Sequence, residues 1–342
     1  MKKPTIMDVA NLAGVSKSTV SAYLNQRYHF MSGATKLKIQ KAIETLNYEP
    51  NALARGLRQK KQQVGVIGLV VGNMTCQNVA QWVRAIQSEC QAQGVQVIIC
   101  DTDDVAEQER ICVNQLLANQ VEGLIVFAHE QNSEIYGQLL EQNYPLVFAQ
   151  RKIPGLDVPV VLCDDSKATQ LAMEYLIEYG HERIVLLMSV ADSRILSHHR
   201  DMEEGYEKAL RNSGMTHPPE YIIRTPTQEM VGALTQLFSG ELTPTAVLAT
   251  SSGALEQLLI FAKKQGYSIP EQLSIMGIDN SRFTAFFQPA ISVISYPVED
   301  MGKQSAKILL EKIAGTGDIP VTYLYPPTLK QRESVTHYSK KS

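Results

Sequence analysis

Side chains able to bind a polyanion are concentrated at the start of the chain. Residues 1–62 contain eleven Lys and Arg and three acidic residues, a net charge of +8, whereas the remaining 280 residues carry a net charge of −11. A basic segment on an acidic body is typical of proteins that contact nucleic acid through one part of the chain. Because apolar residues recur at helical spacing within this segment, we predict a folded head rather than a basic tail.

A second set of polar side chains follows apolar runs of strand length. Asn73, Gln150 and Ser251 come just after such runs, and Asp279 ends another. The carboxyl ends of parallel strands face the crevice in which α/β proteins bind ligands, so these side chains can converge on a small molecule. An ionised Asp279 accepts strong hydrogen bonds from hydroxyl groups, which suits a polyol.

Motifs for reactive chemistry are missing from the sequence. His198 and His199 stand near Asp201 and Glu203, but adjacent histidines on a helix point in different directions, so this segment is interpreted as a solvated loop or helix start rather than a metal site. The five cysteines form no C-x-x-C pair, which favours reduced thiols. Because dinucleotide, phosphate-loop and nucleophile-elbow motifs are also missing, we expect no enzyme activity, no cofactor and no metal.

Three short helices are predicted to carry the basic residues of the head. Thr5 followed by Asp8 is typical of a helix N-cap, and Gly14 can end that helix in the left-handed conformation. Ser16 then caps a helix over 17–24, and Ser32 caps a third helix. A close crossing of the first two helices at a short turn indicates a helix-turn-helix. The predicted inner faces are Ile6, Val9, Ala10 and Ala13, then Val20 and Leu24, then Ile39, Ala42, Ile43 and Leu46.

From residue 64 onward, apolar runs alternate with helix-patterned stretches. This alternation predicts a doubly wound α/β body with parallel sheets, and its two similar halves predict two lobes with a cleft between them. The predicted strands span 64–71, 95–100, 123–128, 145–149, 183–189, 246–250 and 273–279. The predicted helices span 80–93, 106–119, 133–143, 166–179, 202–212 and 253–265.

Membrane and export signals are missing from the sequence. It has no run of about 18 apolar residues, and its first residues, MKKPTIMDVANLAG, lack the apolar core and cleavage site of a signal peptide. We therefore expect a cytoplasmic protein without a membrane partner. Two alternatives are an extracytoplasmic solute receptor and a cytosolic α/β enzyme with an accessory head. The missing signal peptide argues against the first, and the missing catalytic motifs argue against the second.

Roughly the first 60 residues resemble the head of the lactose-repressor/galactose-repressor (LacI/GalR) family. The resemblance rests on TIMDVANLAGVSKSTVSAYLN and MSGATKLKIQKAIETLNYEPNALARGL, and it continues into the body through segments such as IPEQLSIMGIDN. It implies an all-α helix-turn-helix head and a hinge helix, joined to a two-lobed α/β sensor that is similar to periplasmic binding proteins.

This resemblance also implies where the domains begin and end. The helix-turn-helix domain takes residues 1–49, the hinge helix and linker take 50–62, and an effector-binding and dimerisation domain takes 63–338. Within the last domain, the first lobe is expected to take about 63–162 and 292–321. The second lobe is expected to take about 163–291 and 322–338.

Two DNA-contacting elements follow from the resemblance. The second helix enters the major groove with Lys17, Ser18 and Ala22 at base-reading positions, and Ala22 stands where the family often has Arg, so the operator sequence is left open. The hinge helix enters the minor groove, where Leu57 wedges into a base step. A homodimer is expected to bind a near-palindromic operator. The other implied DNA-binding residues are Thr5, Ser16, Thr19, Ser21 and Asn25 in the head and Asn51, Ala54, Arg55 and Arg58 in the hinge.

The resemblance further implies an effector site between the lobes. Met202 replaces an arginine common in the family, but Arg200 is close by and can hold a carboxylate or phosphate if it turns inward. The expected effector is therefore a sugar, sugar acid or sugar phosphate that controls the operator affinity of a transcriptional repressor. The implied effector-binding residues are Asn73, Asn78, Gln150, Arg200, Ser251, Asp279 and Tyr296.

Overall fold

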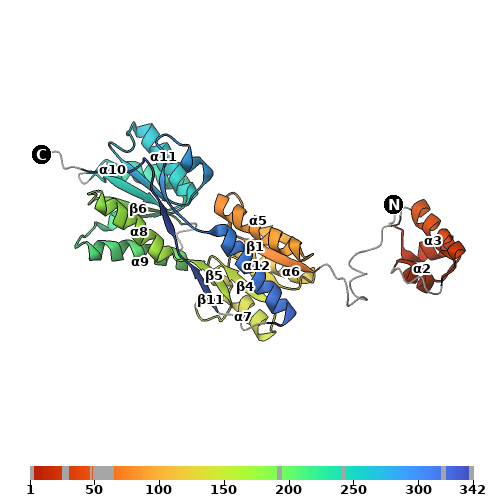
Figure 1. The fold of residues 1–342 in the computed structure, drawn as a ribbon. Coiled ribbons are helices and arrows are strands. Elements are labelled where there is room, and N and C mark those ends of the chain that lie inside the picture. Colours follow the sequence, from red (N-terminus) through yellow and green to blue (C-terminus); the bar gives the residue numbers. More distant parts are fainter. Residues whose placement is uncertain are drawn as a thin grey trace. The chain divides into compact units, whose positions relative to one another are not determined.

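The chain divides into two compact units, Met1–Val64 and Gly65–Ser342. The described part of the first unit is helical, and the second contains two sheets with helices on both faces (Figure 1). The expected hinge over 50–62 lies outside the described residues. The computed structural model describes residues 4–24, 31–46, 48, 65–190, 195–240, 243–316 and 321–338.

Local hydrogen bonds begin and end the first helix of the head, α1 (Ile6–Ala13). The Thr5 N–H donates to Asp8 Oδ2 over 2.7 Å, and the Asp8 N–H donates to Thr5 Oγ1 over 3.4 Å. Gly14 follows the helix with a φ of 63°, a left-handed conformation that glycine adopts without strain. The capping box and the glycine stop predicted from the sequence are therefore confirmed.

The next two helices also begin at serine caps. Ser16 Oγ accepts the Thr19 N–H over 3.1 Å at the start of α2 (Lys17–Leu24). Ser32 Oγ accepts a backbone N–H of the first turn of α3 (Gly33–Leu46). Both caps match the sequence prediction. The first N–H groups of a helix have no acceptor within the helix, and the serine oxygen supplies one.

A small apolar core holds the three helices of the head together. Val9, Val20 and Ile39 are fully buried, and Ala10 and Ala42 are nearly so. All five belong to the inner faces predicted from helical spacing, which are thus confirmed. Burial of this apolar surface is the main stabilising contribution to such a small unit.

Six parallel strands form the sheet of the first lobe, in the order β11-β5-β4-β3-β1-β2. Helices α5 and α12 bury their apolar side chains on one face, and α6 and α7 bury theirs on the other. The strands are β1 (Val66–Val71), β2 (Gln96–Asp101), β3 (Leu124–Val126), β4 (Leu146–Ala149), β5 (Val160–Cys163) and β11 (Thr322–Tyr325). The helices are α5 (Gln77–Ala92), α6 (Ala106–Ala118), α7 (Ser133–Glu141) and α12 (Val298–Ala314), with a short helix η1 (Glu130–Asn132).

The second lobe repeats this arrangement in the order β12-β10-β9-β8-β6-β7, with β12 antiparallel at one edge. Helices α8 and α9 cover one face of the sheet, and α10 and α11 cover the other (Figure 1). The strands are β6 (Ile184–Ser189), β7 (Ile222–Thr225), β8 (Ala246–Ala249), β9 (Ser274–Ile278), β10 (Ser292–Ser295) and β12 (Thr328–Lys330). The helices are α8 (Asp165–Glu178), α9 (Ser197–Asn212), α10 (Met230–Phe238) and α11 (Ser252–Gln265), with short helices η3 (Pro219–Tyr221), η4 (Thr227–Glu229) and η5 (Arg282–Ala285).

The described chain passes between the lobes three times, from β5 to α8, from β10 to α12 and from β11 to β12. Strand β10 therefore lies in the sheet of the second lobe and β11 in that of the first, whereas the expected boundaries at 291 and 321 assigned them the other way round. The reason is that the sequence of a four-residue strand does not reveal which sheet the strand joins, because that depends on pairing with distant strands.

The predicted fold class, a helical head with a two-lobed body of largely parallel sheets, is confirmed. Helix α9 begins at Ser197 rather than near residue 202. The elements that apolar periodicity did not predict are β5, β7, β10, β11, β12, α10 and α12. Within the described residues, no helix is both long enough and apolar enough to cross a membrane.

Candidate functional site

Helix α2 presents several of the predicted DNA contacts on its surface. Lys17 and Ser18 are exposed, and Ser21 and Ala22 are partly exposed. Val20, on the opposite side of the same helix, is fully buried in the core of the head. The second helix thus has one face in the core and one face open, as a helix that enters a major groove requires.

Two predicted DNA contacts, Thr5 and Ser16, form hydrogen bonds within the head. Thr5 Oγ1 donates to Asp8 Oδ2 over 2.7 Å. Ser16 Oγ lies 2.7 Å from Ser18 Oγ and 2.8 Å from Thr19 Oγ1. These hydroxyl groups begin helices, so any phosphate contact they make is shared with a capping role.

Six further predicted DNA contacts lie outside the residues that the structure describes. The minor-groove role assigned to Leu57 therefore stays a prediction. The six are Asn25 in the head and Asn51, Ala54, Arg55, Leu57 and Arg58 in the hinge.

A cavity of about 800 Å³ lies between the two lobes of the body. Asn73 follows β1, Gln150 follows β4 and Ser251 follows β8, and all three line this cavity. It therefore occupies the carboxyl ends of strands from both sheets, which is where doubly wound folds bind ligands.

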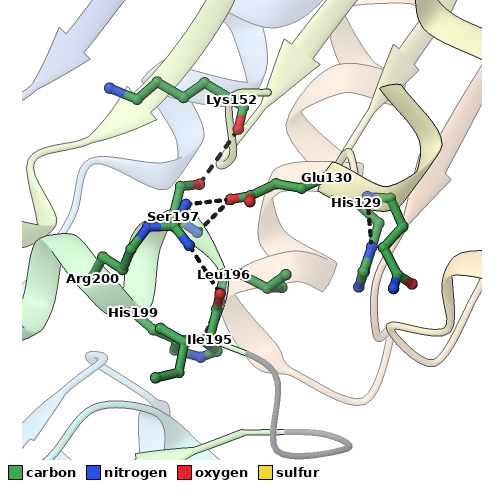
Figure 2. A network of polar contacts seen from close by, with 9 residues as sticks. His129, Glu130, Lys152, Ile195, Leu196, Ser197, His199 and Arg200 are labelled. Carbon is green, nitrogen blue, oxygen red and sulfur yellow. Dashed lines mark hydrogen bonds and ion pairs between the residues drawn. The ribbon is translucent and has the colours of Figure 1, made fainter. Parts of the chain in front are cut away.

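Arg200 does not line this cavity. Its half-exposed guanidinium donates to Glu130 of the first lobe over 2.7 Å and to the carbonyl oxygen of Ile195 over 3.0 Å (Figure 2). The expectation that Arg200 turns inward to hold an anionic effector is not met in this structure, because a carboxylate of the other lobe already pairs with its charge.

Two other predicted effector residues, Asn78 and Tyr296, line a second and more open cavity of about 640 Å³. Asn78 lies on the first turn of α5, and Tyr296 lies where the chain leaves β10 for α12. The Tyr296 hydroxyl donates to Asp165 Oδ1 over 2.6 Å. Spacing in the sequence did not reveal that these two residues line a cavity other than the first, because that depends on how the two lobes meet.

Asp279 lies one side chain behind the wall of the first cavity. Its side chain is nearly fully buried, and burial raises its pKa to about 6, although the neighbouring hydroxyls of Ser281 and Ser252 favour the ionised form and act in the opposite direction. Ser252 itself lines the cavity, whereas Asp279 does not. Any direct contact between Asp279 and an effector therefore requires Ser252 or the effector to move.

Arg151 and Asp104 form a charged pair in the cavity wall that sequence reasoning missed. Their Nη2 and Oδ1 atoms lie 2.7 Å apart, and Arg151 is 8% exposed. Arg151 Nε has no hydrogen-bond partner among the described residues. The available signal was the position of Arg151, directly after Gln150 at the end of an apolar run.

The two adjacent histidines also line the cavity. They lie at the start of α9, as one interpretation of the sequence expected, but His199 is 7% exposed, so its ring is not solvated. Burial lowers the pKa of His199 to about 4 and the pKa of His198 well below its usual range. Both rings are therefore neutral near pH 7 and offer hydrogen bonds rather than positive charge.

Comparison with known proteins gives matches for both units. Residues 5–51 match the family described as "Bacterial regulatory proteins, lacI family", and residues 173–335 match the "Periplasmic binding protein-like domain". The chain is 41% identical over 309 residues to the "Probable HTH-type transcriptional regulator EndR" of Paenibacillus polymyxa, covering 90% of each chain. It is 30% identical over 335 residues to the "HTH-type transcriptional regulator GalR" of Escherichia coli (strain K12), covering 97% of this chain and 96% of that one.

Two solved structures share the fold over nearly the whole length. A "transcriptional regulator CelR-cellobiose complex" superposes with a TM-score of 0.71 at 25% identity, covering 97% of this chain and 99% of that one. The lac repressor dimer bound to operator and the anti-inducer ONPF superposes with a TM-score of 0.77 at 24% identity, covering 98% of this chain and 100% of that one. The extent of these matches, together with the helix-turn-helix head and the two-lobed body, shows that the chain belongs to the lacI family of bacterial regulatory proteins.

Proposed function

We propose that this chain represses transcription by binding operator DNA through its head, and that a neutral carbohydrate bound between the lobes controls this binding. The observation that carries the proposal is the cavity of about 800 Å³, to which both lobes contribute hydroxyl, amide and charged side chains. A ligand that contacts both lobes binds one arrangement of them more tightly than another and so shifts the equilibrium between them.

The charges around the cavity favour a neutral effector over a sugar acid or sugar phosphate. Asp104, Glu107 and Glu256 line it, and the one Lys or Arg among its described lining residues is Arg151, which is already paired with Asp104. The neighbouring histidines stay neutral because burial lowers their pKa values. An anionic ligand would face net negative charge here, whereas hydroxyl groups find many acceptors and donors.

The size of the cavity favours a ligand of more than one sugar ring. Small-molecule sites typically enclose about 300–1,000 Å³, and this cavity, at about 800 Å³, lies in the upper part of that range. A related regulator of similar fold was solved with cellobiose, which is a neutral disaccharide. We assign hydroxyl contacts to Asn73, Gln150, Arg151 and Ser251, with Asp279 joining them if the wall at Ser252 rearranges.

The head is proposed to bind a near-palindromic operator as part of a homodimer. Its net charge of +8 over residues 1–62 supplies the electrostatic attraction to phosphate. We assign base contacts to Lys17, Ser18 and Ala22, phosphate contacts to Thr5, Ser16, Thr19, Ser21 and Asn25, and minor-groove contacts to the hinge residues Asn51, Ala54, Arg55, Leu57 and Arg58. A regulator of this kind acts in the cytoplasm, and the proposal includes no catalytic step.

Calorimetric titration with a matched pair of sugars tests the effector class. Cellobiose and cellobiouronic acid differ mainly in one carboxylate, which replaces a hydroxymethyl group while both rings stay closed, so the proposal expects the neutral member of such a pair to bind more tightly. A parallel gel shift on DNA from the promoter of the chain's own gene should show that the bound sugar changes operator affinity. Tighter binding of the sugar acid would contradict the neutral assignment, and binding of sugar without any effect on DNA affinity would contradict the regulatory role.

A further inference from the structure

The first turn of α9 lacks a side-chain cap of its own. Leu196 occupies its N-cap position, and a leucine side chain has no oxygen that could accept the free N–H groups of the first turn. His199 Nδ1 accepts the Leu196 N–H over 3.2 Å, which satisfies one donor outside the helix. The Ser197 N–H still needs an acceptor, and the second lobe does not supply it.

That acceptor comes from the first lobe. Glu130 Oε1 accepts the Ser197 N–H over 2.8 Å and the Arg200 guanidinium over 2.7 Å (Figure 2). A carboxylate at a helix N-terminus is stabilised by the partial positive charge there, and a paired arginine adds to that effect. The Ser197 hydroxyl also donates to the Lys152 carbonyl oxygen over 3.4 Å, so two segments of the first lobe contact the same turn of α9.

Glu130 is carried by a short helix, η1, that is itself firmly anchored. The buried carboxylate of Glu109 accepts the Tyr136 hydroxyl over 2.7 Å, the Asn132 amide over 2.8 Å and the His129 N–H over 3.0 Å. These bonds fix both ends of the turn on which Glu130 stands. The position of Glu130 is therefore set by the core of the first lobe rather than by a mobile surface loop.

The contact lies at the edge of the inter-lobe cavity. From the second lobe, Leu196, His198 and His199 line that cavity, and from the first lobe, His129 and Gln131 do so. Glu130 and Ser197 are thus each flanked by lining residues. Breaking their contact changes the wall of the cavity on both sides.

We propose that Glu130 is an inter-lobe latch: it caps α9 from the opposite lobe, holds the lobes in the arrangement seen here and positions the α9 turn that lines the effector cavity. Separation of the lobes removes the acceptor of the Ser197 N–H and the carboxylate partner of Arg200, so the arrangement seen here is favoured before any effector binds. The consequence for effector control rests on the proposed function, whereas the latch itself does not.

Hydrogen exchange of the ligand-free, full-length protein tests the latch without knowledge of the effector. Two sites are followed: the first turn of α9, and the Arg282 N–H, which donates across the lobes to Gln77 Oε1 over 3.0 Å at a separate contact. In Glu130→Ala, we expect exchange at the first turn of α9 to be about fivefold faster, as loss of a helix cap implies. Exchange of the Arg282 N–H should also rise, because separation of the lobes breaks that bond too.

Matched variants separate the latch from a general loss of stability. Glu134→Ala removes an exposed acid from the neighbouring helix α7 and should leave the exchange rates at the first turn of α9 and at the Arg282 N–H unchanged. Arg200→Gln removes the ion pair but keeps the Ser197 N–H bond to Glu130, so it should give a smaller change in the same direction. It also serves if Glu130→Ala does not fold.

The outcomes are distinct. Faster exchange at both sites supports the latch. Faster exchange at α9 alone reduces Glu130 to a local cap and overturns its role between the lobes, and unchanged exchange at both sites overturns the proposal entirely. Because no sugar is present, a failure of the carbohydrate assignment does not affect this measurement.

Discussion

At the scale of single residues, the carboxyl of Asp279 shows how burial prepares a side chain for hydrogen bonding. The group lies at the end of β9, where burial raises its pKa to about 6 and the hydroxyls of Ser281 and Ser252 lower it. Its Oδ1 atom is buried without a geometrically satisfactory hydrogen bond among the described residues. Near pH 7 the ionised carboxylate therefore has capacity to accept a further hydroxyl.

If the wall at Ser252 rearranges so that Asp279 contacts the bound sugar, replacement of Asp279 by Ala should weaken effector binding at least about tenfold, because leaving buried ligand hydroxyls without partners costs roughly 1–3 kcal/mol each. Operator affinity of the ligand-free protein should stay nearly unchanged, since the head is a separate unit. Calorimetry with the sugar identified by the matched titration measures the effector affinity, and a gel shift measures the operator affinity. Asp157→Ala, at an exposed acid of the first lobe, serves as the control. Equal affinities in the Asp279→Ala protein and the wild type would remove Asp279 from the site.

At the scale of elements, two crossing segments meet through a buried pair. Asp165 begins α8 directly after the chain leaves the first sheet, and Tyr296 follows β10 directly before the chain returns to the first lobe. Burial raises the pKa of Asp165 to about 7. Asp201 and Asp164 act in the same direction, whereas the Tyr296 hydrogen bond and Arg151 favour the ionised form. The segments that connect the lobes thus contain a group that titrates near neutral pH.

The pKa of Asp165 predicts a pH dependence of stability. Because the folded pKa lies above the ordinary value of 3.8, the folded state holds this proton more tightly than the unfolded state does. The stabilising contribution is complete below about pH 4 and is lost as the pH rises to about 7, with a slope of at most roughly 1.4 kcal/mol per pH unit. Asp165→Asn should remove that part of the slope in urea unfolding measured from pH 4 to 8. A variant whose slope equals that of the wild type would show that Asp165 does not titrate in this range.

Helix packing in the first lobe leads to a further prediction. A Cβ added at Gly302 of α12 would lie 2.6 Å from the Cβ of Ala85 and 2.8 Å from the Trp82 carbonyl oxygen of α5, closer than such atoms approach. Gly302→Ala should therefore lower the free energy of unfolding by about 1–3 kcal/mol, because the helices must move apart. Gly137→Ala, in the interior of α7 with open space around it, should instead raise that free energy by roughly 0.5–1 kcal/mol. Urea denaturation measures the free energy of unfolding of both variants. Similar losses of this free energy in both would show that the close approach of α5 and α12 does not explain the effect of Gly302→Ala.

At the scale of the whole molecule, the charge is divided between a basic head and an acidic body. Residues 1–62 carry +8 and the remaining residues carry −11. An acidic body repels the DNA backbone, so attraction is confined to the head and its orientation on the duplex is favoured. Counterions released from phosphate by the basic head make such binding strongly dependent on salt.

Removal of one basic residue from the head should reduce this salt dependence. If the exposed Lys38 of α3 contacts phosphate, Lys38→Ala weakens binding to all DNA sequences alike. It lowers the slope of log affinity against log salt by about 2, because each subunit of the proposed homodimer loses one contact. Lys263→Ala, at an exposed position of α11 in the body, is the matched control and should leave the slope unchanged. Equal slopes in the Lys38→Ala protein and the wild type would show that this lysine does not neutralise a phosphate.

The sequence by itself determined the features that depend on near neighbours in the chain. The Thr5–Asp8 capping box, the Gly14 stop and the buried faces of α1 to α3 follow from spacings of a few residues, and each was predicted correctly. The alternation of strands and helices, and with it the two-lobed fold, was likewise evident from apolar runs. Asn73 and Gln150 were expected near one another because parallel strands of one sheet end at the same edge. Ser251 follows a strand of the other sheet, and it joins them because the carboxyl ends of both sheets face the cleft.

Only the tertiary structure decided what depends on contacts between distant segments. Three features result from how the lobes meet. Strands β10 and β11 join the sheets that they do, Asn78 and Tyr296 line a cavity other than the first, and Arg200 pairs with Glu130. These partners lie far apart in the sequence, and neither helical nor strand periodicity carries information about them. Burial of a polar side chain is favourable only when a partner is present, and the identity of that partner is fixed by packing rather than by local sequence.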